Sequence, residues 1–355
     1  MKIAIVTDTH WGVRNDNQVF ADYISKFYKE IFFPTIKEKG VDAIFHLGDV
    51  VDRRKYINFL TARRLEEDFI KPISEMGIPL HAIAGNHDTF YKNTNEVNSL
   101  RQLYGTSKYD NIHIYWDEPV ELQMESCKVM MAPWICADNQ EKSFQAFKDT
   151  DAQVLFGHLE MQGFEMMKGQ LCDHGLDKKI FNRFDAVYSG HFHHPSTIDN
   201  ITYLGAPYEM NWSDYDQRRG FNIFDTEDRS MTHVANNLRM FHKIMYDDED
   251  MTIEDIANLD TSNLTNTFIK VIVRNKSNPY IFDLFLDKLQ AAGPCDIKVV
   301  EDHMNLDVID ESELVDEAQD TLTILKQYVS NLEITNDKAK IEKVLDELYQ
   351  EAINL

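Results

Sequence analysis

"KIAIVTDTH" (2–10) is an apolar, β-branched run that ends in two chemically active side chains, Asp8 and His10. Such a run predicts a strand buried on both faces. Two further runs, "VDAIFHLG" (41–48) and "IPLHAIAG" (78–85), also end directly before a polar residue. Because loops at the carboxyl ends of strands build the active site of α/β proteins, the repeated pattern predicts a polar site at one edge of a sheet.

Helix-like stretches separate these strands and continue the alternation. Apolar residues at helical spacing predict helices over 18–38, 57–77 and 95–105. Shorter apolar runs predict further strands at 111–115, 128–132, 152–157, 185–189, 200–204 and 220–225. The alternation of strand and helix indicates an α/β domain over residues 1–235.

Five motifs place His, Asp or Asn directly after a predicted strand. They are "TDTH" (7–10), "GDVVDR" (48–53), "GNHD" (85–88), "GHLE" (157–160) and "GHFHH" (190–194). Each alone has a plain structural explanation, since a lone buried His is usually a core residue and Asn and Asp are ordinary turn residues. Five together at strand ends do not, and oxygen and imidazole donors without thiolates suit Mn²⁺, Fe or Zn²⁺. The set predicts a dinuclear metal site in which one carboxylate bridges two cations.

Charge and composition restrict the partners of the chain. The net charge is −24, and residues 236–355 hold 25 acidic and 11 basic side chains. A sequence-blind DNA binder is usually basic, so a role on nucleic acid must rest on a local site, on bound metal or on a basic partner. The four cysteines form no CxxC pair, and the N-terminus reads as a strand rather than a signal peptide. With no apolar run of membrane-spanning length, we expect a cytoplasmic protein with free thiols and no membrane association.

The C-terminal third has a different pattern. Strands at 266–275 and 295–302 around a helix at 280–291 predict a small β-α-β unit, a capping domain over 236–305. Residues 306–355 follow, with an acidic start and two amphipathic helical patterns at 314–332 and 341–352. These helices either pack on each other or on the cap, or dock on a partner coiled coil.

The five motifs, in this order and spacing, resemble those of the calcineurin-like metallophosphoesterases over roughly the first 235 residues. The resemblance implies an α/β fold, a four-layer αββα sandwich with a small α+β capping domain and C-terminal helices. It also implies two sets of metal ligands that share Asp49. One set is Asp8, His10, Asp49 and His193, and the other is Asp49, Asn86, His158 and His191.

The same resemblance implies catalytic roles for two residues of "GNHD". His87 would face the leaving oxygen as a general acid or charge stabiliser, and Asp88 would orient His87 or its loop. His194, which precedes Pro195, receives no ligand role.

Longer stretches, "FGHLEMQGFEMMKGQLCDHGL" (156–176) and "YLGAPYEMNW" (203–212), resemble the SbcD-type DNA-repair nucleases and, among them, the recombination endonuclease subunits of T-even-like phages. This implies a manganese-dependent exo- and endonuclease acting on DNA ends, with two Mn²⁺ as cofactors. It also implies an SbcC-type SMC-like coiled-coil ATPase as partner, docked by the C-terminal helices, and a homodimer formed by helices near 57–75 and 95–104. Apolar residues on these two helices are Leu60, Phe69, Leu100, Leu103 and Tyr104. About half of these are equally well explained by core packing.

Three alternatives stay open on the sequence alone. Protein serine/threonine phosphatases read GDxVDRG and GNHE, whereas this chain has Arg54 and Asp88 at the differing positions. Phosphodiesterases of small substrates need neither a cap nor trailing helices. A non-catalytic scaffold for the ATPase would have no need of seven matched donors.

Basic residues near the motif loops are candidates for DNA contacts. They are Arg14, Arg53, Lys92, Arg218 and Arg219. Cellular members of the resembled family often carry a His where this chain has Asp52. We expect Asp52 and Arg53 to pair with each other or to shape the loop.

Overall fold

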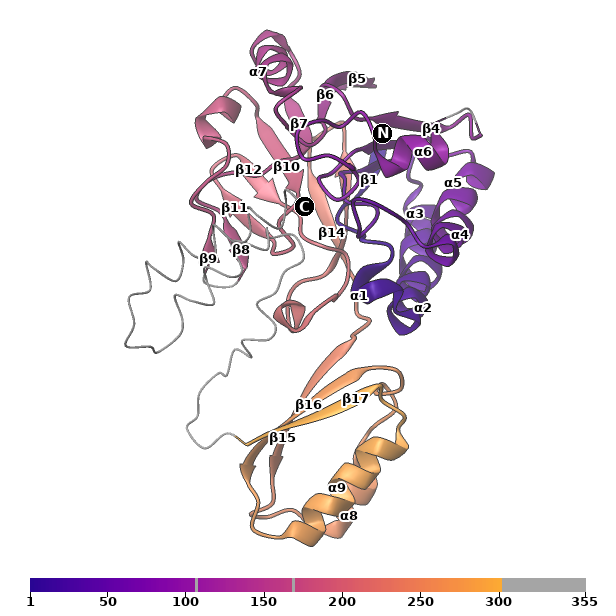
Figure 1. Cartoon of the computed structure of the whole chain (residues 1–355), viewed down its shortest axis with the longest axis vertical. Helices are drawn as coiled ribbons and strands as arrows, with labels where there is room; N and C mark the ends of the chain where they lie inside the picture. Colours follow the sequence, from indigo (N-terminus) through magenta and orange to yellow (C-terminus); the bar gives the residue numbers. More distant parts are fainter. Residues whose placement is uncertain (106–107, 168–169, 302–355) are drawn as a thin grey trace, which may run out of the picture. The chain divides into compact units, whose positions relative to one another are not determined.

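Two six-stranded sheets form the centre of the computed structural model, which describes residues 1–105, 108–167 and 170–301 (Figure 1). The first sheet has the order β14 (Met231–Ala235), β13 (Gly220–Asp225), β1 (Lys2–Val6), β2 (Ala43–His46), β3 (Leu80–Ile83) and β4 (Ile112–Tyr115). The second has the order β11 (Ser196–Ile198), β12 (Ile201–Tyr203), β10 (Ala186–Gly190), β7 (Val154–His158), β6 (Cys127–Ala132) and β5 (Val120–Met124). Strands β1 to β4 run parallel, as do β6, β7, β10 and β12.

The sheets stack because their inner strands are apolar on both faces. In β1, Ile3 and Ile5 enter the core between the two sheets, while Ala4 and Val6 enter the core beneath the helices. Alternate side chains of a strand point to opposite faces, so an uninterrupted apolar run must be covered on both sides. Between the sheets, Phe156 of β7 packs its ring on Phe45 of β2.

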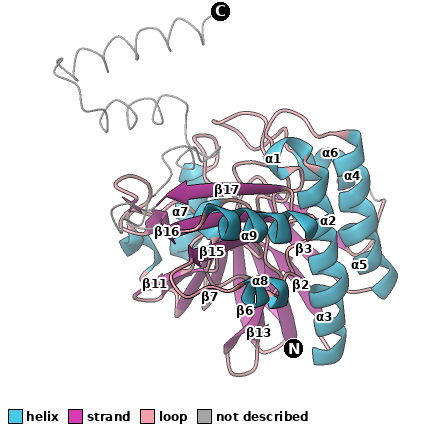
Figure 2. Cartoon of the chain, turned by 90° about the horizontal axis from the view of Figure 1, so that it is seen from below, coloured by secondary structure: helices cyan, strands magenta, loops and turns pink. Residues whose placement is uncertain are grey.

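Helices cover both outer faces of this pair of sheets. Over the first sheet lie α2 (Gln18–Phe27) with α3 (Phe33–Lys39), α4 (Phe59–Leu65) with α5 (Lys71–Met76), and α6 (Ser99–Tyr104). The α2–α3 and α4–α5 pairs are each joined by a π-helical turn, at Tyr28–Phe32 and Glu66–Ile70. Figure 2 shows helices α2 to α6 together on one side of the strands. Helix α7 (Gln140–Asp149) and a 3₁₀ turn at Lys178–Phe181 cover the second sheet. The predicted four-layer αββα sandwich is confirmed.

Smaller elements complete the first 240 residues. They are α1 (Val13–Asp16), a hairpin of β8 (Glu165–Met167) and β9 (Gln170–Leu171), and a 3₁₀ turn at Trp212–Asp214. Strands β5, β11 and β14 and helix α7 were not anticipated from the sequence. Their local patterns are weak: only Ser143 and Phe147 of α7 are buried.

Residues 241–301 form a three-stranded parallel sheet with its own core. Strands β15 (Phe241–Asp247), β16 (Phe268–Asn275) and β17 (Asp296–Glu301) pack against α8 (Ile253–Asn258) and α9 (Pro279–Ala291). This is the predicted β-α-β unit extended by β15 and α8. At its root, the buried Glu209 carboxylate accepts hydrogen bonds from the backbone amides of Met240 and Phe241.

The predicted domain limits (1–235, 236–305 and 306–355) stay a prediction, and the two C-terminal helical patterns lie outside the described residues. Met1–Asp302 form one compact unit. In the described part of the chain, no helix combines the length and the apolar character that a bilayer crossing requires.

Strand pairing brings all five motifs to one edge of the stacked sheets. The parallel pairs β1–β2 and β2–β3 end together, which sets Asp8, Asp49 and Asn86 at the same level. In the second sheet, β10 pairs with β7 so that Gly190 lies opposite His158. The backbone amide of Asp8 also donates to Gly48. The edge predicted to carry the site is therefore a single surface shared by both sheets.

Candidate metal centre

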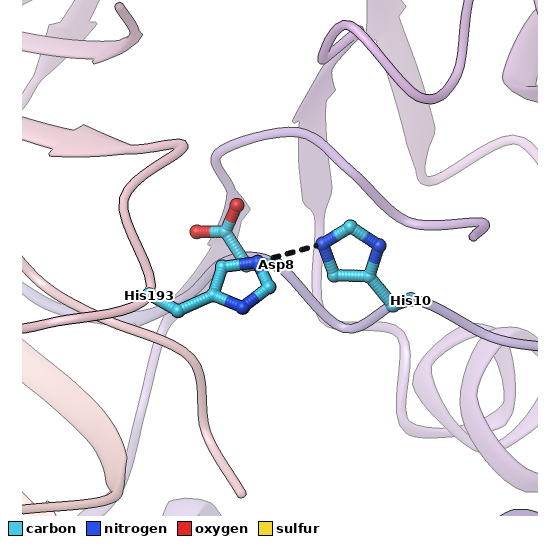
Figure 3. A group of neighbouring side chains, drawn as sticks. All are labelled: Asp8, His10 and His193. Atoms are coloured by element: carbon cyan, nitrogen blue, oxygen red, sulfur yellow. Dashed lines mark hydrogen bonds between the residues drawn. The ribbon is translucent and has the colours of Figure 1, made fainter. Parts of the chain in front are cut away.

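Asp8, His10 and His193 form the first group of side chains at this edge (Figure 3). The Nε2 atoms of His10 and His193 lie 3.0 Å apart, although His193 is 183 residues away in the chain. Both oxygens of the Asp8 carboxylate accept a hydrogen bond from the backbone amide of His191. Potential ligand atoms of the three residues all lie within 4.8 Å of one another.

Asp49, Asn86, His158 and His191 form the second group. The Asn86 Oδ1 atom lies 2.9 Å from His158 Nε2 and 3.0 Å from His191 Nδ1. The Asp49 Oδ2 atom lies 3.3 Å from His158 Nε2 and 3.7 Å from His10 Nε2, so this carboxylate faces both groups. The seven predicted metal ligands are therefore brought together, with Asp49 between the two sets.

The orientation of His158 shows why a cation fits here. Its Nδ1 lies 2.7 Å from the Leu47 carbonyl oxygen, which can only accept, so Nδ1 carries the proton. In the neutral ring, the lone pair of Nε2 then points at the electron-rich oxygens of Asn86 and Asp49. A divalent cation held among these three atoms would turn mutual repulsion into coordination, and the backbone carbonyl fixes the ring as is usual for metal-binding histidines.

The electrostatics of the cluster favour positive charge. Burial alone would lower the pKa of His10, but its hydrogen bond to Asp52 and the charges of Asp49, Asp52 and Asp8 raise that pKa to about 10. Burial opposes protonation of His158 too, yet the charge of Asp49 raises its pKa to about 9. Burial would raise the pKa of Asp49, but the imidazoles of His158 and His87 hold it well below its usual range. Divalent cations bound among these side chains would supply the positive charge that protons on His10 and His158 supply in their absence.

Glycines let the loops approach one another at the cluster. A Cβ atom on Gly85 would lie 2.2 Å from Asp49 Oδ1, and one on Gly190 would lie 2.0 Å from Thr7 Oγ1. Gly48 has a φ of +92°, and a Cβ atom on it would lie 2.6 Å from Nδ1 of His158. At these positions the lack of a side chain permits the close approach of the backbone to neighbouring groups.

Several ligand candidates hold a strained backbone. Asp8, His10, Asp49 and His191 have φ angles of +53°, +41°, +53° and +90°. Such conformations cost about 1–3 kcal/mol each in non-glycine residues and cluster at functional sites. The fold therefore aims these side chains at one point at the expense of stability.

His87 lies against the cluster, with a potential ligand atom within 4.8 Å of those of His10 and Asp49, whereas Asp88 lies in the loop behind it. The His87 ring packs edge-on against His10 at 4.8 Å, and its Nδ1 lies 2.5 Å from the carbonyl oxygen of Asp52. Asp88 is fully buried and accepts hydrogen bonds from the amides of Val50, Val51 and Gly85. It therefore ties the His87 loop to the Asp49 loop and makes no contact with the His87 ring that would orient it directly.

Two contacts at the site were missed or misassigned from the sequence. Arg53 pairs with Asp16 at 2.9 Å, so of the two expectations for Asp52 and Arg53 the structure favours the one in which they shape the loop. The Asp52 carboxylate lies 3.4 Å from His10 Nδ1, while its carbonyl holds His87, so it contacts both histidines. Glu160 was also overlooked, although it lies in the "GHLE" motif and its Oε1 is 3.7 Å from His191 Nε2.

The basic residues predicted to contact DNA have unequal surroundings. Arg218 and Lys92 are exposed, and Arg14 donates to the carbonyl of Met210. Arg219 is 3% exposed and forms a buried ion pair with Asp214 at 2.6 Å, while its other nitrogen donates to the carbonyl of His193. Arg219 thus supports the backbone of a predicted ligand, which does not suit a phosphate contact.

Some of the apolar residues considered for a homodimer are buried, which core packing explains, and others are exposed. Phe69, Leu100 and Tyr104 are buried in the core beneath the helices, whereas Leu60 is 44% exposed. The neighbouring Phe59, not singled out from the sequence, is 93% exposed. His194 pairs with Glu165 at 3.3 Å, and all four cysteines are free thiols.

The sequence of the chain is similar to that of known phosphoesterases and nucleases. Residues 1–195 match the family model of the calcineurin-like phosphoesterases. The chain belongs to this family. It is 30% identical to exonuclease subunit 1 of Enterobacteria phage T4, over 99% of both chains. It is 25% identical to the SbcD component of the SbcCD nuclease of Staphylococcus epidermidis over 80% of this chain and 79% of that one, and 23% identical to the corresponding Staphylococcus saprophyticus protein over 99% of both. The resemblance inferred from the motifs is confirmed.

The close approach at Gly85 yields a prediction about metal affinity. Gly85→Ala should weaken Mn²⁺ binding about 10- to 100-fold, because the added methyl group displaces the Asp49 carboxylate. Isothermal titration calorimetry of Mn²⁺ into the chelator-treated protein measures the effect. Gly77→Ala is the control: its φ is +67° but no atom lies within 4 Å of the added carbon. It should cost about 1 kcal/mol of stability and leave Mn²⁺ affinity unchanged. Wild-type affinity in Gly85→Ala would contradict the assignment of Asp49.

Proposed function

We propose that this phosphoesterase is a metal-dependent DNA nuclease that hydrolyses phosphodiester bonds, as exonuclease and endonuclease, at DNA ends in recombination and repair. The observation that carries the proposal is the convergence of seven residues with nitrogen or oxygen donors at one sheet edge, with Asp49 facing both groups. Full-length similarity to a phage exonuclease subunit supports a nuclease over other phosphoesterases.

Two divalent cations fit the donor set, and Mn²⁺ suits its mixture of carboxylate, amide and imidazole ligands. Asp8, His10, Asp49 and His193 would hold one, and Asp49, Asn86, His158 and His191 the other. When bound, the pair would supply Lewis-acid chemistry to a phosphoryl group and lower the pKa of an attacking water. Glu160 would orient the His191 ring through the nitrogen that does not face Asn86.

His87 is the residue proposed to act on the leaving oxygen. Because the Asp52 carbonyl can only accept, the proton of Nδ1 is committed to it, and Nε2 is the atom left for substrate. Proton donation from Nε2 then requires the doubly protonated ring, which would also stabilise negative charge on the leaving oxygen. The backbone amide of His87 donates to Asp49 Oδ1 at 2.8 Å, which keeps the ring in register with the metal ligands. Asp88 holds the same loop in place through the hydrogen bonds that it accepts from the amides of Val50, Val51 and Gly85.

Partners remain part of the proposal. Arg218, Lys92 and Arg14 are exposed and are the candidates for contacts with DNA phosphates, and Arg53 is half-buried in its pair with Asp16. Residues 306–355 would dock on an SMC-like coiled-coil ATPase of the SbcC type. The exposed Phe59 and Leu60 at the start of α4 would contribute to a homodimer contact. The protein would work in the cytoplasm.

The direct test is degradation of linear duplex DNA by the purified protein. Degradation should require Mn²⁺, stop on addition of a chelator and return when Mn²⁺ is restored. Hydrolysis should leave 3′-hydroxyl and 5′-phosphate ends. Turnover of a generic phosphodiester without any degradation of DNA would instead favour a small-substrate phosphoesterase.

His87→Gln should lower the rate of that degradation by about a hundredfold or more, because an amide replaces the proton donor. Mn²⁺ affinity and DNA affinity should stay near those of the wild type, since His87 is not a proposed ligand. His113→Gln, at an exposed histidine of β4, is the matched control and should cleave normally. Cleavage by His87→Gln at the wild-type rate would refute the assigned role.

A further inference from the structure

Exposed aromatic rings are concentrated on the two chain segments that follow the motifs "GDVVDR" and "GNHD". Among the described residues, five Phe, Tyr or Trp side chains are more than a third exposed, and four of them lie on two segments that Arg54 joins by hydrogen bonds. These are Tyr56, Phe59, Phe90 and Tyr91, and the fifth is Tyr280 of α9. Phe59 begins α4 and belongs to the proposed dimer contact, but Tyr56, Phe90 and Tyr91 lie on loops.

The loop that carries Phe90 and Tyr91 is held firmly. The backbone amide of Phe90 donates to Val97 at 2.8 Å, closing the loop at its base. The Arg54 guanidinium, on the neighbouring loop, donates to the carbonyls of Thr89 and Tyr91. The Phe90 and Tyr91 rings contact each other edge-to-face at 4.7 Å. A hydrogen-bonded loop thus holds the two rings three and four residues beyond His87, with 37% of Phe90 and 50% of Tyr91 left exposed.

The charge around these rings opposes that of the chain as a whole. Although the net charge is −24, the segment 53–55 reads Arg-Arg-Lys, and Lys92 follows Tyr91 directly. The Arg53 guanidinium lies 5.0 Å from the centre of the Tyr56 ring while it pairs with Asp16. Aromatic faces interleaved with cations suit a ligand that offers flat rings on an anionic backbone.

We propose that Tyr56, Phe90 and Tyr91 form a stacking surface for unpaired bases of a DNA strand whose phosphate lies at the metal centre. This rests on the proposed nuclease function and adds the form of its substrate: a strand end with at least one or two unpaired nucleotides. Every base has a π-face, so stacking would hold such a strand without reading its sequence. The favoured occupant is nucleic acid rather than a second copy of this chain, because Lys55 and Lys92 match a phosphate backbone, whereas the cores of protein interfaces are depleted of lysine.

The experiment compares two DNA duplexes with short single-stranded ends, one normal and one whose unpaired sugars lack bases. Binding is measured by fluorescence anisotropy with Ca²⁺ in place of Mn²⁺. The wild type should bind the normal end about tenfold more tightly than the abasic end. The Phe90→Ala/Tyr91→Ala double variant should lose this preference by weakening on the normal end alone. Tyr91→Phe, which keeps the ring, and Tyr280→Ala, at the distant exposed ring, should bind like the wild type.

Two outcomes would overturn the stacking surface. One is equal weakening of both DNAs by the double variant. The other is a shift of oligomeric state in sedimentation without any dependence on bases, which would make this surface a contact between copies of the chain. Failure of the nuclease proposal is distinguishable, because the wild type would then bind neither DNA and degrade none.

Discussion

The buried carboxylate of Asp49 is the constraint on which the rest of the site depends. Its Oδ2 faces His158 and His10, its Oδ1 accepts from the amide of His87, and its backbone has a φ of +53°. A carboxylate this deep is stable only when cations or donors surround it. His158, His10 and the amide of His87 surround it, and Gly85 leaves room for it because it has no side chain.

This arrangement explains how an acidic chain can be suited to a polyanionic substrate. The negative charge of the cluster is concentrated on Asp8, Asp49 and Asp52, where metal ions would neutralise it. Beyond the cluster, the cations and exposed rings of the loops at 53–56 and 90–92 provide a local surface of the opposite character. The charges next to the site therefore matter more for binding than the net charge of the chain, because salt screens the more distant exposed charges.

Much of the fold, and the meeting of the ligand candidates at one edge, could be predicted because the signals are local. Each apolar run that ended in Asp, Asn or His became a strand with its polar residue at the shared edge, as "KIAIVTDTH" did with β1. The αββα layers were expected from the resemblance to the calcineurin-like family, and the inner strands, apolar on both faces, agree with it. Weakly patterned elements such as β5 and α7 escaped prediction because half-buried polar segments carry little periodic signal.

What could not be predicted depended on tertiary geometry. Asp52 contacts His10 and His87 through two different groups, and neither contact leaves a trace in the spacing of residues. The buried pair of Arg219 and Asp214 looks in the sequence like any other charges near a motif. Tyr91 and Phe90 follow "GNHD" as ordinary loop residues, and only their exposure gives them meaning.

The most direct test of a shared carboxylate between two cations is electron paramagnetic resonance of the protein loaded with two equivalents of Mn²⁺. Bridging by Asp49 predicts the multiline spectrum of an exchange-coupled Mn²⁺ pair, and Asp49→Asn should convert it to the six-line signal of isolated ions or lose binding. A six-line spectrum from the wild type, unchanged as the second equivalent is added, would contradict the account.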